Sequence, residues 1–259
     1  MDLRIVVAAH KPYAMPSDPA YVPLQVGALG KPPIVNEQGR EFLRDDTGDN
    51  ISAKNSSWCE MTGVYWAWKN LKSDAIGLAH YRRHFRGRGG SIATGDEIRA
   101  ILEGTDGNPP VDVLLPKKRN YFIESTYSQY AHAHHAKDLD LTREVLSELD
   151  PESVVHFDAA MKSTRGHRFN MFVMRRALFD DYCSWIFPIL EALEDRLDTT
   201  GYSQYDLRVY GFLAERLLDV WIARRGVKYA ERPVLHLEGQ NWPRKILSFL
   251  TRKFIRRRA

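Results

Sequence analysis

The sequence predicts an α/β fold, and three observations support this. The segment Leu3–Ala9 (LRIVVAA) is a continuous, β-branched apolar run, which is typical of a strand buried on both faces of a sheet. Further short apolar runs alternate along the chain with amphipathic stretches of helical period. The chain has 259 residues, 44% of them hydrophobic, and is long enough to bury a sizeable core without disulfides or metal ions.

The first third of the chain is expected to run strand, loop, helix, strand. Residues 14–50 are rich in Pro, Gly and Asp, so we expect an extended loop region with a short helix or strand around residues 21–29. A helix should begin near Ser57, because Ser57 and Glu60 have the spacing of a capping box. A buried strand over residues 75–79 should follow it.

The rest of the chain continues this alternation within one domain, residues 1–241. We expect strands over residues 111–115 and 169–174, and helices over residues 125–136, 139–149, 151–162, 176–197 and 205–223. On the last helix the apolar residues form one stripe. The opposite, polar side should then carry Arg208, Gly211, Glu215 and Asp219.

Composition excludes several classes of protein. Two cysteines, Cys59 and Cys183, provide neither a disulfide framework nor paired metal ligands, which fits a reducing, cytoplasmic compartment. No apolar run approaches the roughly 18 residues of a spanning helix, and the N-terminus shows no signal-peptide pattern, so we expect a soluble or peripheral protein. Residues 244–258 hold seven Lys and Arg and no acid. The other 30 basic residues face 33 acidic ones, so no nucleic-acid partner is expected.

Two strand ends are the first candidates for a ligand site, because open α/β sheets bind ligands beyond the carboxyl ends of their strands. The first strand is followed by His10, Lys11 and Tyr13. The strand at residues 75–79 is followed by His80, Tyr81, Arg82, Arg83 and His84. Paired arginine N–H donors suit a phosphate or a diphosphate. The alternative is a solvated basic turn.

Other polar clusters are less specific. Residues 45–52 (DDTGDNIS) fit a metal loop, a loop that binds sugar hydroxyls, or an ordinary turn, but lack the pattern of a calcium-binding loop. His132, His134 and His135 lack the spacing of zinc ligands, although one of them could act as a general base or as a surface contact. Neither cysteine has an adjacent His to activate a thiol nucleophile.

Several motifs occur in a recognisable order: AAHKPY, YVPLQVGA, DDTGDNIS, NSSWCEMTGVYWAWKNL, IGLAHYRRHF, FNMFVM and RVYGFLAERLL. From His10 to about Trp221 the chain resembles bacterial capsular and exopolysaccharide glycosyltransferases first catalogued as a domain of unknown function and associated with galactofuranose transfer. The resemblance implies a GT-A-like nucleotide-sugar-binding domain with a mixed, mostly parallel sheet flanked by helices. It also implies transfer of galactofuranose from UDP-galactofuranose onto a capsular, exopolysaccharide or O-antigen glycan.

The resemblance also implies roles for individual residues. The HYRR segment stands where GT-A enzymes usually carry a metal-binding Asp-x-Asp, so transfer is expected to be independent of metal and of any cofactor. Tyr13 is available to stack on uracil, beside His10 and Lys11. Contacts to ribose or to the donor sugar are expected from Asp46, Asp49, Asn50, Glu60, Trp66, Asn170 and Arg208. For Glu60 the alternative is the capping box, and for Trp66 it is the hydrophobic core.

An inverting transfer needs a group that takes the proton of the acceptor hydroxyl. Glu215 is the first candidate, since it lies on the expected polar side of its helix with Gly211 leaving room for a ligand. The alternative is a solvated surface glutamate. Asp206 and His134 are further candidates for the base.

The C-terminal tail, residues 242–259, is expected to form a basic amphipathic helix. Trp242 to Arg258 would lie on an anionic membrane, at the inner face of the cytoplasmic membrane, where a polyprenyl-diphosphate-linked acceptor would be found. A packed terminal helix and an oligomer contact are the alternatives. For the whole chain, the competing functions are a transferase of the same fold with another UDP-hexose, and a non-catalytic, membrane-associated glycan- or nucleotide-binding module.

Overall fold

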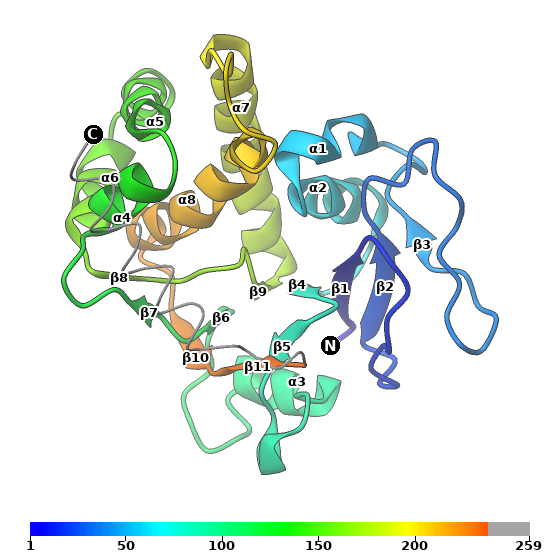
Figure 1. The fold of residues 1–259 in the computed structure, drawn as a ribbon. Helices are drawn as coiled ribbons and strands as arrows, with labels where there is room; N and C mark the ends of the chain where they lie inside the picture. Colours follow the sequence, from blue (N-terminus) through cyan, green and yellow to red (C-terminus); the bar gives the residue numbers. More distant parts are fainter. Residues whose placement is uncertain (238–259) are drawn as a thin grey trace.

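A mixed β-sheet forms the centre of the computed structural model, which describes residues 1–237 (Figure 1). The main path of the sheet has the strand order β10-β6-β9-β4-β1-β2-β3. These strands are β1 Leu3–Ala9, β2 Tyr21–Gln25, β3 Leu43–Arg44, β4 Ala75–His80, β6 Val113–Pro116, β9 Phe172–Arg175 and β10 Tyr229–Arg232. All pairings along this path are parallel except the two that β9 makes, with β4 and with β6. The predicted mixed, mostly parallel α/β sheet is therefore confirmed.

Four short strands lie beside this path. Strand β5 (Arg83–Phe85) pairs antiparallel with the end of β4 and with β11 (Val234–His236). Strands β7 (Arg119–Asn120) and β8 (Arg165–Gly166) form a separate two-stranded sheet. Both additions lie near the carboxyl ends of the parallel strands.

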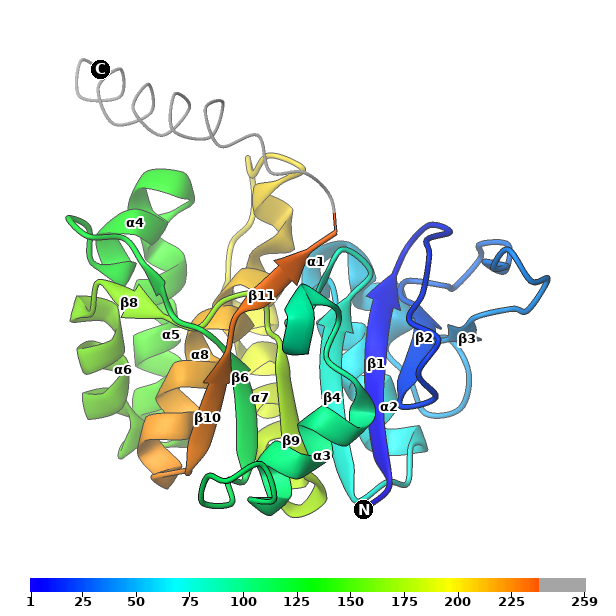
Figure 2. The same ribbon diagram turned by 90° about the horizontal axis from the view of Figure 1, so that it is seen from below.

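The helices cover the two faces of the sheet unequally (Figures 1 and 2). Helix α3 (Gly95–Glu103) packs on one face. The other face is covered by a thicker helical layer, and short 3-10 turns connect several elements. The remaining helical segments are η1 Ser52–Lys54, α1 Asn55–Trp58, α2 Met61–Asn70, η2 Arg88–Gly90, α4 Thr126–Ala133, α5 Ala136–Leu149, α6 Ser153–Lys162, α7 Arg176–Arg196, η3 Asp206–Arg208 and α8 Val209–Arg225.

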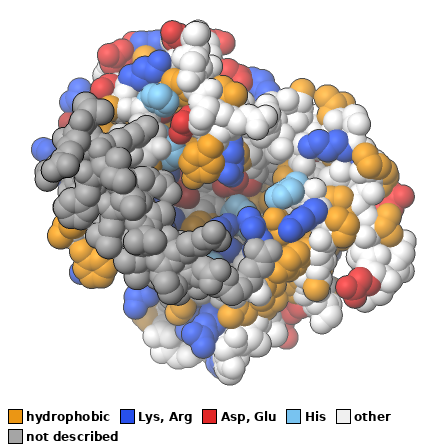
Figure 3. Space-filling model, viewed as in Figure 1, with side chains coloured by type: hydrophobic (Ala, Val, Ile, Leu, Met, Phe, Trp, Pro, Cys, Tyr) orange, Lys and Arg blue, Asp and Glu red, His pale blue; other side chains and the backbone are white. Residues whose placement is uncertain are grey.

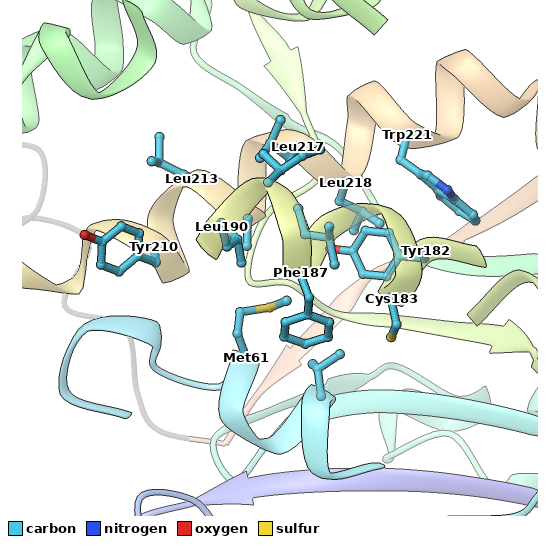
Figure 4. Packing of buried hydrophobic residues seen from close by; sticks show 14 of the residues in the cluster. Met61, Tyr182, Cys183, Phe187, Leu190, Tyr210, Leu213, Leu217, Leu218 and Trp221 are labelled. Carbon is cyan, nitrogen blue, oxygen red and sulfur yellow. The ribbon is translucent and has the colours of Figure 1, made fainter. Parts of the chain in front are cut away.

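Alternating residues of β1 divide the hydrophobic core in two. Ile5 and Val7 face the α3 side, whereas Val6 and Ala8 face the thicker helical layer. This period of two is what a strand covered on both faces requires. In the helical layer, residues of α2, α7 and α8 pack together, as Figure 4 shows. The prediction that residues 3–9 form a strand buried on both faces is thus confirmed.

Two local predictions are wrong. The capping box at Ser57 does not form, because α1 ends at Trp58 and Cys59 then takes a positive φ of 53° before α2 begins at Met61. The strand expected from residue 169 begins only at Phe172, because Phe169 and Asn170 have φ of 77° and 53°. The short element expected around residues 21–29 forms as strand β2, and the two-residue strand β3 also lies within residues 14–50.

Helix α8 also lacks the polar side that the sequence predicts. Gly211 is buried, and a Cβ atom added there would lie 3.0 Å from Cys59 Cβ, so Gly211 provides close packing of α8 against the α1–α2 turn. Arg216 on the same helix is buried as well. Glu215 and Asp219 are each only 17% exposed.

Within residues 1–237, no helix combines the length and the apolar character needed to cross a membrane. The helix predicted for the tail at residues 242–259 lies outside the described residues, as does the predicted domain boundary at residue 241.

Candidate active site

The parallel strands bring several polar chain segments to one edge of the sheet. β1 ends at Ala9 and β4 at His80, so His10 and residues 80–83 follow at the carboxyl edge (Figure 2). Because β9 runs in the opposite direction, its beginning lies at this same edge, and residues 168–170 meet residues 80–83 there. The direct evidence is a contact between His80 Nε2 and the carbonyl oxygen of Phe169, at 2.5 Å.

A cavity of about 600 Å³ lies at this edge. Figure 3 shows Lys and Arg, His and acidic side chains gathered around a hollow on this face of the molecule. Nine of the predicted site residues line the cavity: His10, Glu60, His80, Tyr81, Arg82, Arg83, His134, Arg208 and Glu215. The described lining is strongly basic, with six arginines and two glutamates. Such a lining favours an anionic ligand with several phosphate oxygens.

Aromatic rings and cations surround Tyr81 at one end of the cavity. The Tyr81 hydroxyl lies 3.4 Å from His10 Nε2, and the Tyr13 ring contacts the Tyr81 ring edge-on at 5.0 Å between centroids. Lys11 Nζ lies 5.6 Å from the Tyr81 centroid, and the Arg82 guanidinium lies 4.9 Å from it. Burial and the nearby Arg82 lower the pKa of His10, so this ring is neutral at pH 7.

Arg83 is directed into the site from β5. Its guanidinium lies 4.6 Å from the Phe169 ring centroid, and its Nε atom is buried with no hydrogen-bond partner among residues 1–237. Burial and the charge of Arg82 lower the pKa of Arg83, yet a guanidinium stays protonated at neutral pH. A ligand oxygen at Arg83 Nε would therefore remove an unpaired buried donor.

Glu60, another of the predicted site residues, is held in place by the loop before β9. Its Oε1 accepts a hydrogen bond of 2.8 Å from Asn170 Nδ2. The neighbouring Cys59 Sγ lies 3.2 Å from Arg208 Nε. Burial, followed by the charge of Glu60, raises the pKa of the Cys59 thiol to about 11, so this cysteine is a protonated thiol at neutral pH and a poor nucleophile.

Glu215 is fully engaged in hydrogen bonds. Its Oε2 accepts from the Phe169 backbone N–H at 2.7 Å, and its Oε1 accepts from Arg216 Nη1 at 2.7 Å. Arg168 Nε lies 3.8 Å from Oε1. The carboxylate thus fixes the start of β9 and is not the solvated surface glutamate that was the alternative expectation.

His134 and Asp206, the other two candidates for the base, form one unit. His134 Nδ1 lies 3.0 Å from Asp206 Oδ1, and Ser203 Oγ donates to Asp206 Oδ2 at 2.6 Å. Burial lowers the pKa of His134, which the hydrogen bond to Asp206 opposes. Burial would raise the pKa of Asp206, but the hydrogen bonds from Ser203 and His134 outweigh it and lower that pKa.

The structure does not bring the other predicted sugar contacts to the cavity lining. Three side chains of the DDTGDNIS loop bond to β3, to α2 and within the loop: Asp46 pairs with Arg44, Asp49 accepts from Tyr65, and Asn50 donates to the Gly48 carbonyl. Trp66 is buried and donates to Thr47, as the core interpretation expects. Lys11, Tyr13, Asn170 and Asp206 lie just behind lining residues, through Tyr81, Glu60 and His134.

Sequence reasoning missed several lining residues. Arg119 and Tyr121 follow β6, and the same strand-end argument could have found them. Arg168 and Phe169 precede β9, and nothing in the sequence indicates that this strand is reversed. The remaining lining residues come from the ends of β1 and β2, from the α1–α2 region, and from α4, α8 and the segment before η3: Ala8, Val26, Asn55, Ser56, Cys59, Gln129, Ala133, Tyr205, Gly211, Phe212 and Arg216. In residues 1–237, no three His, Cys, Asp or Glu side chains are grouped so that they could hold a metal ion.

Comparison with known proteins finds a solved glycosyltransferase structure with a similar fold. The apo structure of the bifunctional glycosyltransferase WbbM superposes with a TM-score of 0.82 and 29% sequence identity over 92% of this chain. The match covers 46% of the WbbM chain, so this chain spans just under half of that protein's length. A search of curated proteins finds no match. The chain belongs to the family described as domain of unknown function DUF4422, whose profile matches residues 4–226.

Proposed function

We propose that this protein is a glycosyltransferase that moves a hexose from a nucleoside-diphosphate sugar to a glycan acceptor. The observation that carries the proposal is the cavity at the carboxyl edge of the sheet, with its six arginines. A nucleotide-sugar donor presents a diphosphate, and its departure requires positive charge close to the leaving oxygens. The similarity to the bifunctional glycosyltransferase WbbM supports the same reaction class.

The proposed donor is UDP-galactofuranose, with inversion at the transferred carbon. The shared motifs of the galactofuranose-associated family support this choice, because they include the strand ends that form the cavity. Tyr13, Lys11 and His10 gather around Tyr81, and this aromatic and basic corner suits a uracil ring and its ribose. Among the predicted sugar contacts, Glu60 and Arg208 line the cavity and keep that role, whereas Asp46, Asp49, Asn50 and Trp66 are no longer proposed for it.

The proposed reaction uses arginine side chains to stabilise the leaving diphosphate in place of a divalent cation. Arg82 and Arg83 follow the central strand β4, and the unpaired Arg83 Nε is available to a phosphate oxygen. The two lining carboxylates are already engaged, Glu60 by Asn170 and Glu215 by Arg216 and Phe169. Transfer should therefore continue in the presence of EDTA.

The proposed acceptor is a growing surface glycan linked to polyprenyl diphosphate, at the inner face of the cytoplasmic membrane. The seven basic residues within 244–258 and the interleaved apolar side chains support membrane binding by the tail. Co-sedimentation with anionic vesicles should be lost in a chain that ends at Asn241. Equal binding of the full and the shortened chain would contradict this part of the proposal.

The deciding experiment measures UDP release from a panel of UDP-sugars, including UDP-galactofuranose, with and without EDTA. We expect turnover of the furanose donor that EDTA does not reduce. Turnover of a pyranose donor only would keep the reaction class and change the donor. Loss of activity in EDTA with recovery in Mn²⁺ would contradict the arginine-based leaving-group site. UDP binding without turnover, even with a lipid-linked galactoside present, would favour a binding module.

A further inference from the structure

The cavity has a second wall, formed by α4 and α8, which differs in character from the HYRR end. Gln129, Ala133 and His134 contribute from α4 and its C-terminal cap, and Phe212 and Arg216 contribute from α8. The His134 and Phe212 rings lie 4.4 Å apart between centroids, and the Tyr205 ring stacks on His134 at 5.6 Å. This wall combines aromatic surface with a few polar groups, a composition that suits the mixed apolar and hydroxyl faces of a sugar ring.

Two buried polar atoms on this wall lack partners among residues 1–237. Arg216 has a side chain only 5% exposed; its Nη1 donates to the Phe212 carbonyl and to Glu215, but its Nε donates to nothing. Gln129 Oε1 is likewise buried without a partner. An unpaired buried polar group is costly, so a ligand that pairs both is favoured. One is a donor and the other an acceptor, and a hydroxyl-bearing ligand can satisfy both.

The base candidate with a free nitrogen stands on this wall. Asp206 binds His134 through Nδ1, which leaves Nε2 as the nitrogen that can take a proton. The charges of Arg216 and Asp138 also act on His134, and the Tyr130 and Tyr205 rings contact it at 4.8 Å and 5.6 Å between centroids. Burial keeps the pKa of His134 below its ordinary value of 6.5, so the ring is an unprotonated base at neutral pH. Glu215, by contrast, has both oxygens engaged.

We propose that the α4–α8 wall is the acceptor subsite, with His134 as the general base and Asp206 as its positioning residue. Gln129 and Arg216 bind hydroxyl groups of an acceptor sugar, which packs against Phe212 and Tyr205. This inference rests on the proposed glycosyl transfer and states where its second substrate, the acceptor, binds. The acceptor oxygen forms a bond to the donor's anomeric carbon, and the bond from that carbon to the diphosphate oxygen breaks. Its electron pair leaves with UDP, and the hydroxyl proton moves to His134 Nε2.

The first test uses Gln129→Leu to separate effects on acceptor binding from effects on donor binding. An alkyl β-galactoside serves as the acceptor probe. We expect its KM to rise at least about tenfold, because a hydrogen bond to a buried group is lost. The Kd of UDP and the acceptor-free release of UDP should stay within twofold of the unsubstituted chain. Gln38→Leu, on an exposed loop, is the matched control. An equal loss of UDP affinity in Gln129→Leu would place the residue in the donor half and overturn the assignment.

The second test addresses the base. His134→Gln should lower kcat for transfer about a hundredfold or more with an unchanged Kd for UDP, while His132→Gln, at the same helix end, should have little effect. In the unsubstituted chain, transfer should fall at acid pH with a midpoint below 6.5. The hydrogen bond from His134 Nδ1 to Asp206 raises the pKa of His134, so Asp206→Asn should move this midpoint to lower pH and also lower the plateau. Turnover of His134→Gln within threefold of the unsubstituted chain would remove it from the role.

A binding measurement that does not depend on catalysis tests the acceptor subsite separately from the proposed transferase activity. Saturation-transfer NMR should detect the alkyl galactoside on the full chain in the presence of UDP, and Gln129→Leu should weaken this signal. Galactoside binding in a protein that releases no UDP from any donor would refute the transferase proposal and leave the subsite standing. No saturation transfer with the unsubstituted chain, with or without UDP, would refute the subsite itself. Near-native circular dichroism of each variant excludes misfolding as the cause.

Discussion

The Asn170 side-chain amide donates to Glu60 Oε1 at 2.8 Å and to the Gly211 carbonyl at 3.0 Å. These two hydrogen bonds join three separate parts of the chain: the loop before β9, the α1–α2 turn and the first turn of α8. Asn170 is buried and has a positive φ of 53°, a conformation that Asn tolerates better than most residues. The position of Glu60 in the cavity wall thus depends on an amide more than a hundred residues away in the sequence.

Replacing this amide with a carboxylate should destabilise the protein in a pH-dependent way. In Asn170→Asp two carboxylates would face each other, and one of them would have to hold a proton, with a pKa raised above that of the unfolded chain. Stability is then retained at low pH and lost as the pH rises. We expect a deficit of about 2–4 kcal/mol in the free energy of unfolding at pH 8, and a smaller one at pH 5. Urea titrations at both pH values test this, with Asn36→Asp as the control. A deficit that is equal at both pH values would contradict the pairing.

The contact between Gly211 and Cys59 should show energetic coupling. A Cβ atom on Gly211 would lie 3.0 Å from Cys59 Cβ and 3.1 Å from Sγ, so Gly211→Ala should cost about 1–3 kcal/mol. Cys59→Gly removes both atoms and suits the positive φ at that position. The double variant should therefore be more stable than the sum of the single effects predicts, by about 1 kcal/mol. Gly211→Ala combined with Cys183→Ala should be additive, and additivity in the Cys59 pair would refute the contact.

Burial of His84 should make stability fall in mild acid. His84 is 0% exposed, and burial together with the nearby His80 lowers its pKa to about 4, whereas the unfolded chain has the ordinary value of 6.5. Below pH 6.5 the unfolded state binds a proton that the folded state rejects until about pH 4. Between pH 7 and pH 5 the loss from this group should be about 2 kcal/mol. His84→Gln should flatten the profile over this range. An equally steep profile in that variant would assign the acid sensitivity to other groups.

Removing the half-buried guanidinium of Arg83 should weaken nucleotide binding. Arg83→Ala should raise the Kd of UDP about 10- to 100-fold, because a charged hydrogen bond to the diphosphate is lost. Arg88→Ala, in the exposed turn after β5 with an 85% exposed side chain, should change it less than twofold. Isothermal titration at two salt concentrations measures both effects. Comparable affinities for the two variants would move the diphosphate away from residues 80–83.

Strand ends were the most informative feature of the sequence. His10 and residues 80–83 follow uninterrupted apolar runs, and in a parallel sheet such positions must meet at one edge, so their convergence follows from period and topology. The same argument from strand ends would also have placed Arg119 and Tyr121, which follow β6, at this edge of the sheet. The fold class was predictable for a related reason, because parallel sheets with both faces covered occur almost only in α/β proteins.

Polar clusters were less informative, because their partners lie far away in sequence. In DDTGDNIS, Asp45 is fully buried and accepts from the backbone N–H groups of Gly27 and Ala28 and from the hydroxyls of Ser52 and Thr62. The loop therefore has a structural role that no local spacing reveals. The engagement of Glu215 depends in turn on the positive φ of Phe169 and on the reversed direction of β9, which are tertiary properties.

The reversed strand β9 also has a consequence for how the chain is synthesised. In the β4–β9 pairing, Ala75 lies opposite Arg175 and Leu78 lies opposite Phe172. Because β9 is synthesised about a hundred residues after β4, one edge of β4 stays unpaired until most of the polypeptide has left the ribosome. During that interval the apolar AIGLA segment is an exposed template for pairing with other nascent chains. Truncated chains that end before residue 172 should therefore aggregate. Slower translation of the segment after β4 should lengthen the time for which the nascent chain needs a chaperone.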